Sequence, residues 1–101
     1  MSALEEMLES EVQNSEIIND YLQIHFTNGS ILNVYNSYIV RRGRLTEIKG
    51  KKLCAVLESD IKLELVFCDS LTIAVDLTSE AYNGPEAMQL IRDGHPTIIW
   101  N

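Results

Sequence analysis

Residues 61–77 read IKLELVFCDSLTIAVDL, and this stretch decides the fold. Apolar and polar residues alternate in its first half and again in its second, the period of two that turns one face of a β-strand toward a core. A three-residue loop at residues 68–70 keeps apolar residues opposite one another, whereas a two-residue loop would pair them with polar ones. The predicted pairs are Phe67 with Leu71, Leu65 with Ile73, Leu63 with Val75 and Ile61 with Leu77. The sequence therefore predicts a hairpin with one apolar face.

The same pattern occurs 41 residues earlier, where residues 22–36 read LQIHFTNGSILNVYN. The loop ends in Gly29, at the position that needs a positive φ when a type I turn runs into a bulge. The register predicts Leu22 opposite Val34 and Ile24 opposite Leu32. Two such hairpins indicate either an internal duplication or two solutions to one packing problem. Their apolar faces need each other, because a lone hairpin is marginally stable in water.

Further strands are predicted at residues 38–40, 53–57 and 97–100. The stretch at 53–57 is apolar on both faces, which is typical of a central strand that is covered on two sides. At 101 residues the chain is long enough for one domain, residues 1–101, with a single core. We therefore expect an α+β fold: an antiparallel sheet of six or seven strands, a sandwich or half-barrel, built from two similar hairpins and two short helices.

The two helices are predicted near the ends of the sequence. Ser2 and Glu5 have the spacing of a capping box, and apolar residues follow at helical spacing, so we expect a helix over residues 3–12. Pro85, after Gly84 and before an acidic residue, is typical of a first helical turn. This predicts a second helix over residues 85–92.

The two cysteines do not form a disulfide framework. Cys54 lies in an apolar run and is expected to be a buried thiol, and Cys68 is expected at a turn, without a disulfide between them. The cytoplasm is then the default compartment. The first residues have no basic or apolar region of the kind that a secretion signal needs, and no apolar run is long enough to span a bilayer.

Charge is distributed unevenly. The net charge is −7, and six of the eight bases fall within residues 41–52, so most of the surface is expected to be acidic, to repel nucleic acid and acidic membranes, and to attract a basic partner. The candidate partner-binding residues are Glu5, Glu6, Glu9, Glu58, Asp60 and Asp69. The alternative interpretation of such acids is an ordinary solvated face.

The basic segment supports a different hypothesis, a nucleic-acid-binding or regulatory module. Arginines and lysines around a glycine, with tyrosines near by, can hold a phosphate backbone. The candidate contacts are Arg41, Arg42, Arg44, Lys51 and Lys52. The alternative is that these bases sit on edge strands, where lysines prevent sheets from aggregating edge to edge.

No motif for catalysis or cofactor binding is present. The two histidines, His25 and His95, share no ligand-type spacing with the cysteines, so no metal site is expected. A phosphate-binding glycine loop and a serine-nucleophile elbow are both missing from the sequence. We therefore expect a protein that is not an enzyme and takes no cofactor.

The last third of the chain contains Tyr-x-Gly-Pro-Glu-Ala-Met at residues 82–88 and Ile-Ile-Trp at residues 98–100, after the hairpin pattern L-x-L-x-F-x-D at residues 63–69. These motifs resemble a group of small bacterial proteins that includes immunity proteins of contact-dependent growth inhibition and related polymorphic toxin systems. Over roughly residues 20 to 101 the resemblance is structural, and it names no binding residue. Ser70 stands where such hairpins often have glycine.

The resemblance implies a protein that neutralises a cognate toxin domain by stoichiometric binding. Many such toxins are nucleases with basic clefts, and an acidic protein could cover such a cleft with fast, salt-dependent association. The partner is therefore expected to be basic, and the protein is expected to act in the cytoplasm. The sequence is also compatible with a homo-oligomer that forms through an exposed strand edge.

Overall fold

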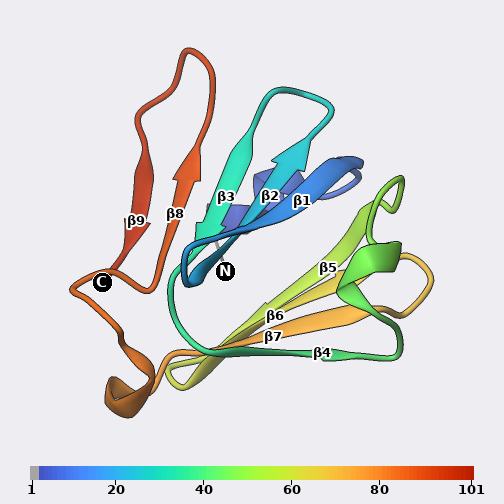
Figure 1. Ribbon diagram of the computed structural model, residues 1–101. Helices are drawn as coiled ribbons and strands as arrows, with labels where there is room; N and C mark the ends of the chain where they lie inside the picture. Colours follow the sequence, from blue (N-terminus) through green and yellow to red (C-terminus); the bar gives the residue numbers. More distant parts are fainter. Residues whose placement is uncertain (1–2) are drawn as a thin grey trace.

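The computed structural model describes residues 3–101, which form two antiparallel β-sheets (Figure 1). The five-stranded sheet has the order β1-β2-β3-β8-β9, and the four-stranded sheet has the order β4-β7-β6-β5. The strands of the first are β1 (Val12–Ile18), β2 (Tyr21–Phe26), β3 (Ile31–Val34), β8 (Met88–Ile91) and β9 (Ile98–Trp100). Those of the second are β4 (Tyr38–Arg41), β5 (Leu53–Glu58), β6 (Lys62–Phe67) and β7 (Thr72–Asp76).

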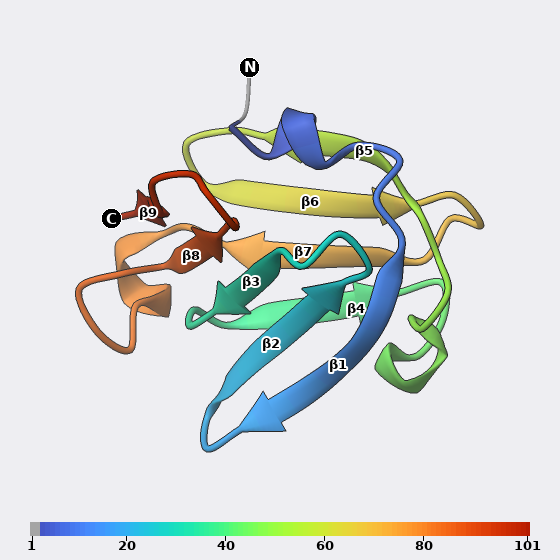
Figure 2. The ribbon, with the colours of Figure 1, turned by 90° about the horizontal axis from the view of Figure 1, so that it is seen from above.

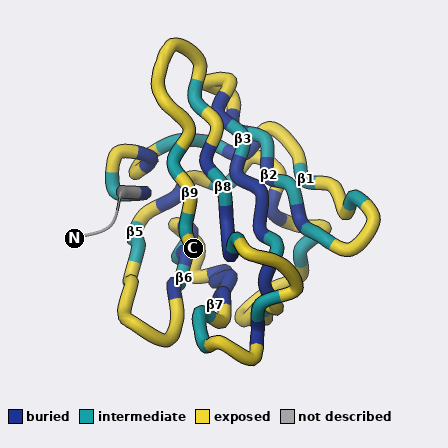
Figure 3. Tube along the Cα trace, turned by 90° about the vertical axis from the view of Figure 1, so that its left-hand side faces the viewer, coloured by how far each residue is buried: buried dark blue, intermediate teal, exposed yellow. Residues whose placement is uncertain are grey.

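The two sheets pack face to face, with their strands crossing obliquely (Figure 2). Apolar residues from both inner faces form one buried cluster, to which β2 contributes Leu22 and Ile24, and β6 contributes Leu63 and Leu65. The outer faces and the loops are largely exposed (Figure 3). The predicted antiparallel β architecture is confirmed in its sandwich form, but the described residues form nine strands in two sheets and not one sheet of six or seven strands.

Both hairpins have the predicted register. In the later one Leu63 lies opposite Val75 and Leu65 opposite Ile73. At its two ends the Phe67 N–H donates to the Leu71 carbonyl, and the Leu77 N–H donates to the Ile61 carbonyl, each at 2.8 Å. In the earlier hairpin the pairs Leu22–Val34 and Ile24–Leu32 are also as predicted. Alternation of apolar residues therefore located both turns correctly.

A short segment, residues 9–12, joins the edges of the two sheets. The Glu9 N–H donates to the Leu53 carbonyl (2.7 Å), and the Val12 N–H donates to the Lys51 carbonyl (2.8 Å). On its other side, the Glu11 carbonyl accepts from the Thr27 N–H (2.9 Å). The segment thus hydrogen-bonds to the start of β5 in one sheet and to the end of β2 in the other, and it closes one side of the sandwich.

The predicted N-terminal helix over residues 3–12 is wrong. Residues 3–7 form the short 3₁₀ helix η1 (Ala3–Met7), and β1 has already begun at Val12. Leu4 and Met7 are buried, and one 3₁₀ turn is enough to bury two residues at that spacing. Glu9 then takes a positive φ of 72°, which ends the turn. Ser2, the predicted cap, lies outside the described residues.

The predicted helix over residues 85–92 is also wrong. The chain passes from the 3₁₀ helix η3 (Ser79–Ala81) through a loop into β8. In β8, Met88 and Leu90 are buried while Gln89 is half-buried and Ile91 exposed, which is the two-residue period of a strand. Within residues 3–101 the helical pieces are all short 3₁₀ turns, the third being η2 (Leu45–Glu47), so the α component of the expected α+β class is not supported. None of them has the length and apolar character needed to cross a membrane.

Candidate partner-binding site

Half of the basic side chains are already paired with acids. Among the described residues, Arg41 Nη1 lies 3.7 Å from Glu64 Oε2, and Lys62 Nζ lies 3.7 Å from Glu64 Oε1. Lys51 pairs with Asp69, and Arg92 pairs with Glu6. Such partly exposed pairs add little stability, but they neutralise bases locally. The excess of negative charge therefore resides on the remaining acids.

Two of the predicted partner-binding acids meet at one groove. Glu5, on η1, and Glu58, at the end of β5, line a hollow of about 310 Å³ whose wall also includes Leu57 and Glu64. Leu57 is 55% exposed. The second half of β5 and the turn that follows are exposed as well (Figure 3). The groove thus combines an exposed apolar side chain with three carboxylates and one base, Lys62, which pairs with Glu64.

The other four predicted acids lie elsewhere. Asp60 is exposed in the β5–β6 turn, next along the chain from the groove. Glu6 pairs with Arg92 and Asp69 pairs with Lys51, so neither contributes a free charge. Glu9 lies beside the two cysteines. The sequence analysis did not identify Glu64. Its polar position in the alternating pattern of β6 could have placed it on the outer face.

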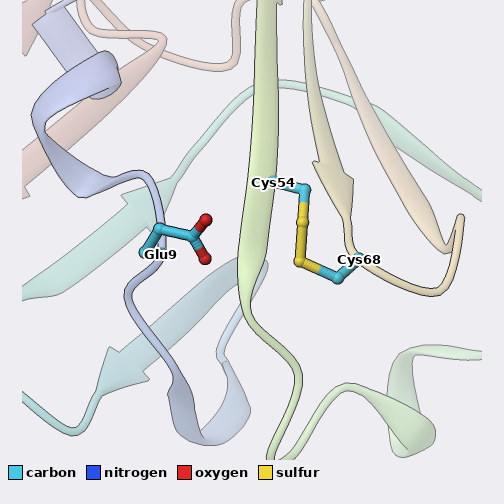
Figure 4. Close-up of side chains that lie close together, drawn as sticks. All are labelled: Glu9, Cys54 and Cys68. Atoms are coloured by element: carbon cyan, nitrogen blue, oxygen red, sulfur yellow. A yellow bond between two sulfur atoms is a disulfide. The ribbon is translucent and has the colours of Figure 1, made fainter.

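The two cysteines form a disulfide, contrary to the prediction (Figure 4). Cys54 lies at a bulge of β5 and Cys68 in the turn after β6, with Cα atoms 5.0 Å apart. Both are exposed, because β5 is an edge strand and not the central, doubly covered strand that its composition predicted. Leu53 is fully buried, so Cys54, the next residue of the strand, points to the opposite, outer face. Cys54 is therefore not a buried thiol.

Glu9, at the start of the segment at residues 9–12, lies close to the disulfide. Its carboxylate is within 4.8 Å of both sulfurs (Figure 4). Two thiolates and a carboxylate are ligand types that Zn²⁺ accepts, but sulfurs joined to each other offer no thiolate. In the oxidised state the cluster is thus a covalent brace between β5 and the β6–β7 turn. Glu9 does not line the groove between η1 and β5.

The basic segment is divided among several neighbours. Arg41 lies beside Glu64, and Lys51 pairs with Asp69. The backbone N–H of Arg44 donates to Glu47 Oε1 (2.7 Å), and Lys52 lies opposite Glu11 in an isolated bridge. Arg42 is exposed in the loop after β4, with a positive φ of 60°. A continuous basic surface over residues 41–52 would have to include these acids, which oppose phosphate binding.

Side-chain amides cross the outer face of the five-stranded sheet, and sequence reasoning did not identify them as a group. Gln23 Nε2 donates to Asn33 Oδ1 (2.9 Å), and Asn33 Nδ2 donates to Gln89 Oε1 (3.2 Å). His25 points to the same face, with Nε2 2.7 Å from Gln23 Oε1 and 3.5 Å from Glu16. The row ends at Tyr35, whose hydroxyl donates to Gln89 Oε1 (3.1 Å). These bonds fix the side chains of the face before any partner arrives.

In comparisons with family models, with curated proteins and with solved structures, nothing matches this chain. Its function is therefore inferred from the arrangement of its own residues.

Proposed function

We propose that this chain is an immunity protein that neutralises a basic toxin domain by stoichiometric binding. The observation that carries the proposal is the groove between η1 and β5, where Glu5 and Glu58 flank the exposed Leu57. An exposed apolar residue with a charged rim is the usual composition of a protein-binding surface. A basic toxin domain is also the kind of partner that the motifs at residues 63–69 and 82–88 led us to expect.

Binding would proceed in two stages. The net charge of −7 attracts a basic domain from a distance and raises the association rate, an effect that salt weakens. On contact, Leu57 is buried and the carboxylates pair with the partner's bases. The toxin is then blocked sterically, at its active site or at an exosite, and this chain performs no catalysis and needs no cofactor.

The proposed place of action is the cytoplasm, where a nuclease toxin would reach its substrate. The disulfide bears on this, because exposed disulfides persist in oxidising compartments and are reduced by cellular dithiols in the cytoplasm. The groove is formed by η1 and by the half of β5 beyond Cys54. We therefore expect partner binding to survive reduction.

The deciding experiment is capture of native partners from the source cell on tagged protein, with and without nuclease treatment. We expect one basic polypeptide to be retained in near-stoichiometric amount after nuclease treatment. Expressed alone, that polypeptide should arrest growth, and co-expression with this chain should restore it. Retention of nucleic acid that disappears on digestion, with no protein left, would instead favour the basic segment, and replacing Arg41, Arg42 and Arg44 should then abolish it.

A further inference from the structure

A second pocket, of about 240 Å³, lies at one end of the five-stranded sheet. Asp20 in the β1–β2 turn and Tyr21 at the start of β2 form one side. Tyr35, just after β3, and the Asn83–Glu86 loop, which leads into β8, form the other. These segments meet because β2 and β8 begin where the antiparallel β3 ends (Figure 1).

The pocket has aromatic walls and negative charge. The rings of Tyr21 and Tyr35 have centroids 5.0 Å apart and planes inclined by 56°. The only charged residues that line the pocket, within the described part of the chain, are Asp20 and Glu86, and neither takes part in an ion pair there. Burial, followed by the charges of Tyr21 and Glu86, raises the pKa of Tyr35 above its ordinary value. Because both charged residues that line the pocket are acids, the pocket favours a cation.

The walls are held in place by hydrogen bonds that do not involve a ligand. The Tyr35 hydroxyl donates to Gln89 Oε1 (3.1 Å), at the end of the amide row. Asn83 Nδ2 donates to the Tyr35 carbonyl (2.9 Å), and the Tyr35 N–H donates to the Ala87 carbonyl (2.9 Å). A site whose side chains are already ordered loses less conformational entropy on binding. This pocket therefore has the features of a preformed receptor for a side chain.

We propose that this pocket holds an arginine side chain of the basic partner. The inference rests on the proposed function and gives a binding role to the segment at residues 82–88, whose motif otherwise indicates only structure. A guanidinium group is planar, so it stacks on a tyrosine ring while its N–H groups donate to carboxylates. Asp20 and Glu86 supply those carboxylates, and Tyr21 and Tyr35 supply the rings. A neutral side chain of the same shape keeps N–H donors but has no positive charge, so it loses the cation–π attraction and the charge assistance of the hydrogen bonds.

The test on the isolated chain uses capped arginine as the probe, with capped citrulline as its uncharged counterpart. Arginine should shift the amide resonances of Tyr21, Tyr35 and Gly84 in a saturable way, and citrulline should bind at least about tenfold more weakly. The double variant Asp20→Asn with Glu86→Gln should lose arginine binding by at least about tenfold. Tyr21→Leu should weaken it about two- to fivefold.

A matched control removes the same two charges at the opposite ends of β1 and β8, by Glu11→Gln with Asp93→Asn. This control should bind arginine as the wild type does. Equal shifts with arginine and citrulline would overturn the proposal, as would wild-type arginine binding by the Asp20→Asn, Glu86→Gln variant.

The captured partner separates this proposal from the proposed function. Asp20→Asn with Glu86→Gln should weaken its binding about tenfold while the control pair leaves it unchanged. A partner that binds both variants equally would overturn the arginine pocket and leave the immunity function standing. A failure to capture any basic polypeptide would remove the immunity function, and with it the partner's arginine, even if free arginine binds.

Discussion

Asn28 and Asp69, 41 residues apart in the chain, make the same hydrogen bond in their two hairpin turns. Asn28 Oδ1 accepts from the N–H of Ser30 (2.9 Å), and Asp69 Oδ1 accepts from the N–H of Leu71 (3.3 Å). The residue between each pair has a positive φ, 89° at Gly29 and 83° at Ser70. The two turns are therefore built alike, although only one of them has glycine at this position.

Replacing Ser70 with glycine should stabilise the protein by about 1 kcal/mol, because a left-handed conformation strains a residue that has a Cβ. Chemical unfolding in urea measures the change. The reverse substitution, Gly29→Ser, should cost a similar amount; a Cβ there meets no atom within 4 Å, so the loss would be conformational. An unchanged or lower stability of Ser70→Gly would show that Ser70 carries no strain.

Opening the disulfide should lower the free energy of unfolding by roughly 3 kcal/mol, since Cys54 and Cys68 close a loop with a sequence separation of 14. The thermal midpoint of the wild type should fall when a dithiol reductant is added. Cys54→Ser should match the reduced wild type and show no further response to reductant. A wild-type thermal midpoint that does not change on addition of reductant would contradict the Cys54–Cys68 disulfide.

Thr78 should control the titration of Asp76. The Thr78 hydroxyl (2.7 Å), followed by the Thr78 N–H (2.9 Å), holds the pKa of Asp76 below its ordinary value of 3.8. A depressed folded-state pKa stabilises the protein above the unfolded pKa, and this stability is lost as the pH falls through the folded value. Thr78→Val should raise the pKa of Asp76 in an NMR titration. Its stability deficit at neutral pH should shrink in acid, and a deficit of the same size at both would contradict this account.

Reversing the charge of Glu5 and Glu58 to lysine should slow association with the captured partner about tenfold at low salt and should flatten the dependence of the rate on salt. Dissociation should change less. Stopped-flow or surface-based kinetics separate the two rates. Glu80→Lys, on η3, serves as the control, because Glu80 does not line the groove. Equal association rates for all variants would place the interface on another surface.

The hairpins could be predicted from the sequence because each has only one register that pairs its apolar residues with one another, although Ile61, at the end of the later one, is 61% exposed. At residues 88–91 the pattern was ambiguous: Met88, Leu90 and Ile91 fit one face of a helix, and Met88 with Leu90 also fits one face of a strand. The pairing of β8 with β3, which decides for the strand, joins residues such as Leu32 and Leu90 that are distant in the sequence. Local sequence propensity gives no information about a contact between such distant residues.

The candidate site was predictable in its charge but not in its arrangement. Composition indicated an acidic surface, but it could not show which acids form ion pairs within the chain. Arg92 pairs with Glu6 and Lys51 pairs with Asp69, and both acids had been predicted to contact the partner. The disulfide was missed because the apolar run at residues 53–57 indicated a central strand that is covered on both faces. In the structure β5 is an edge strand, and Cys54 lies on its exposed face, next to the buried Leu53.

The order of the strands has a consequence for synthesis of the protein on the ribosome. The four-stranded sheet is made from one uninterrupted part of the sequence, but it is inserted between β3 and β8 of the other sheet. A nascent chain that has already released β1, β2 and β3 therefore leaves the edge of β3 unpaired until Met88 has been translated. Closing so long a loop is slow, and an open strand edge is a template for a second chain. The interval between translation of β3 and of β8 thus sets the period in which neighbouring nascent chains can associate wrongly.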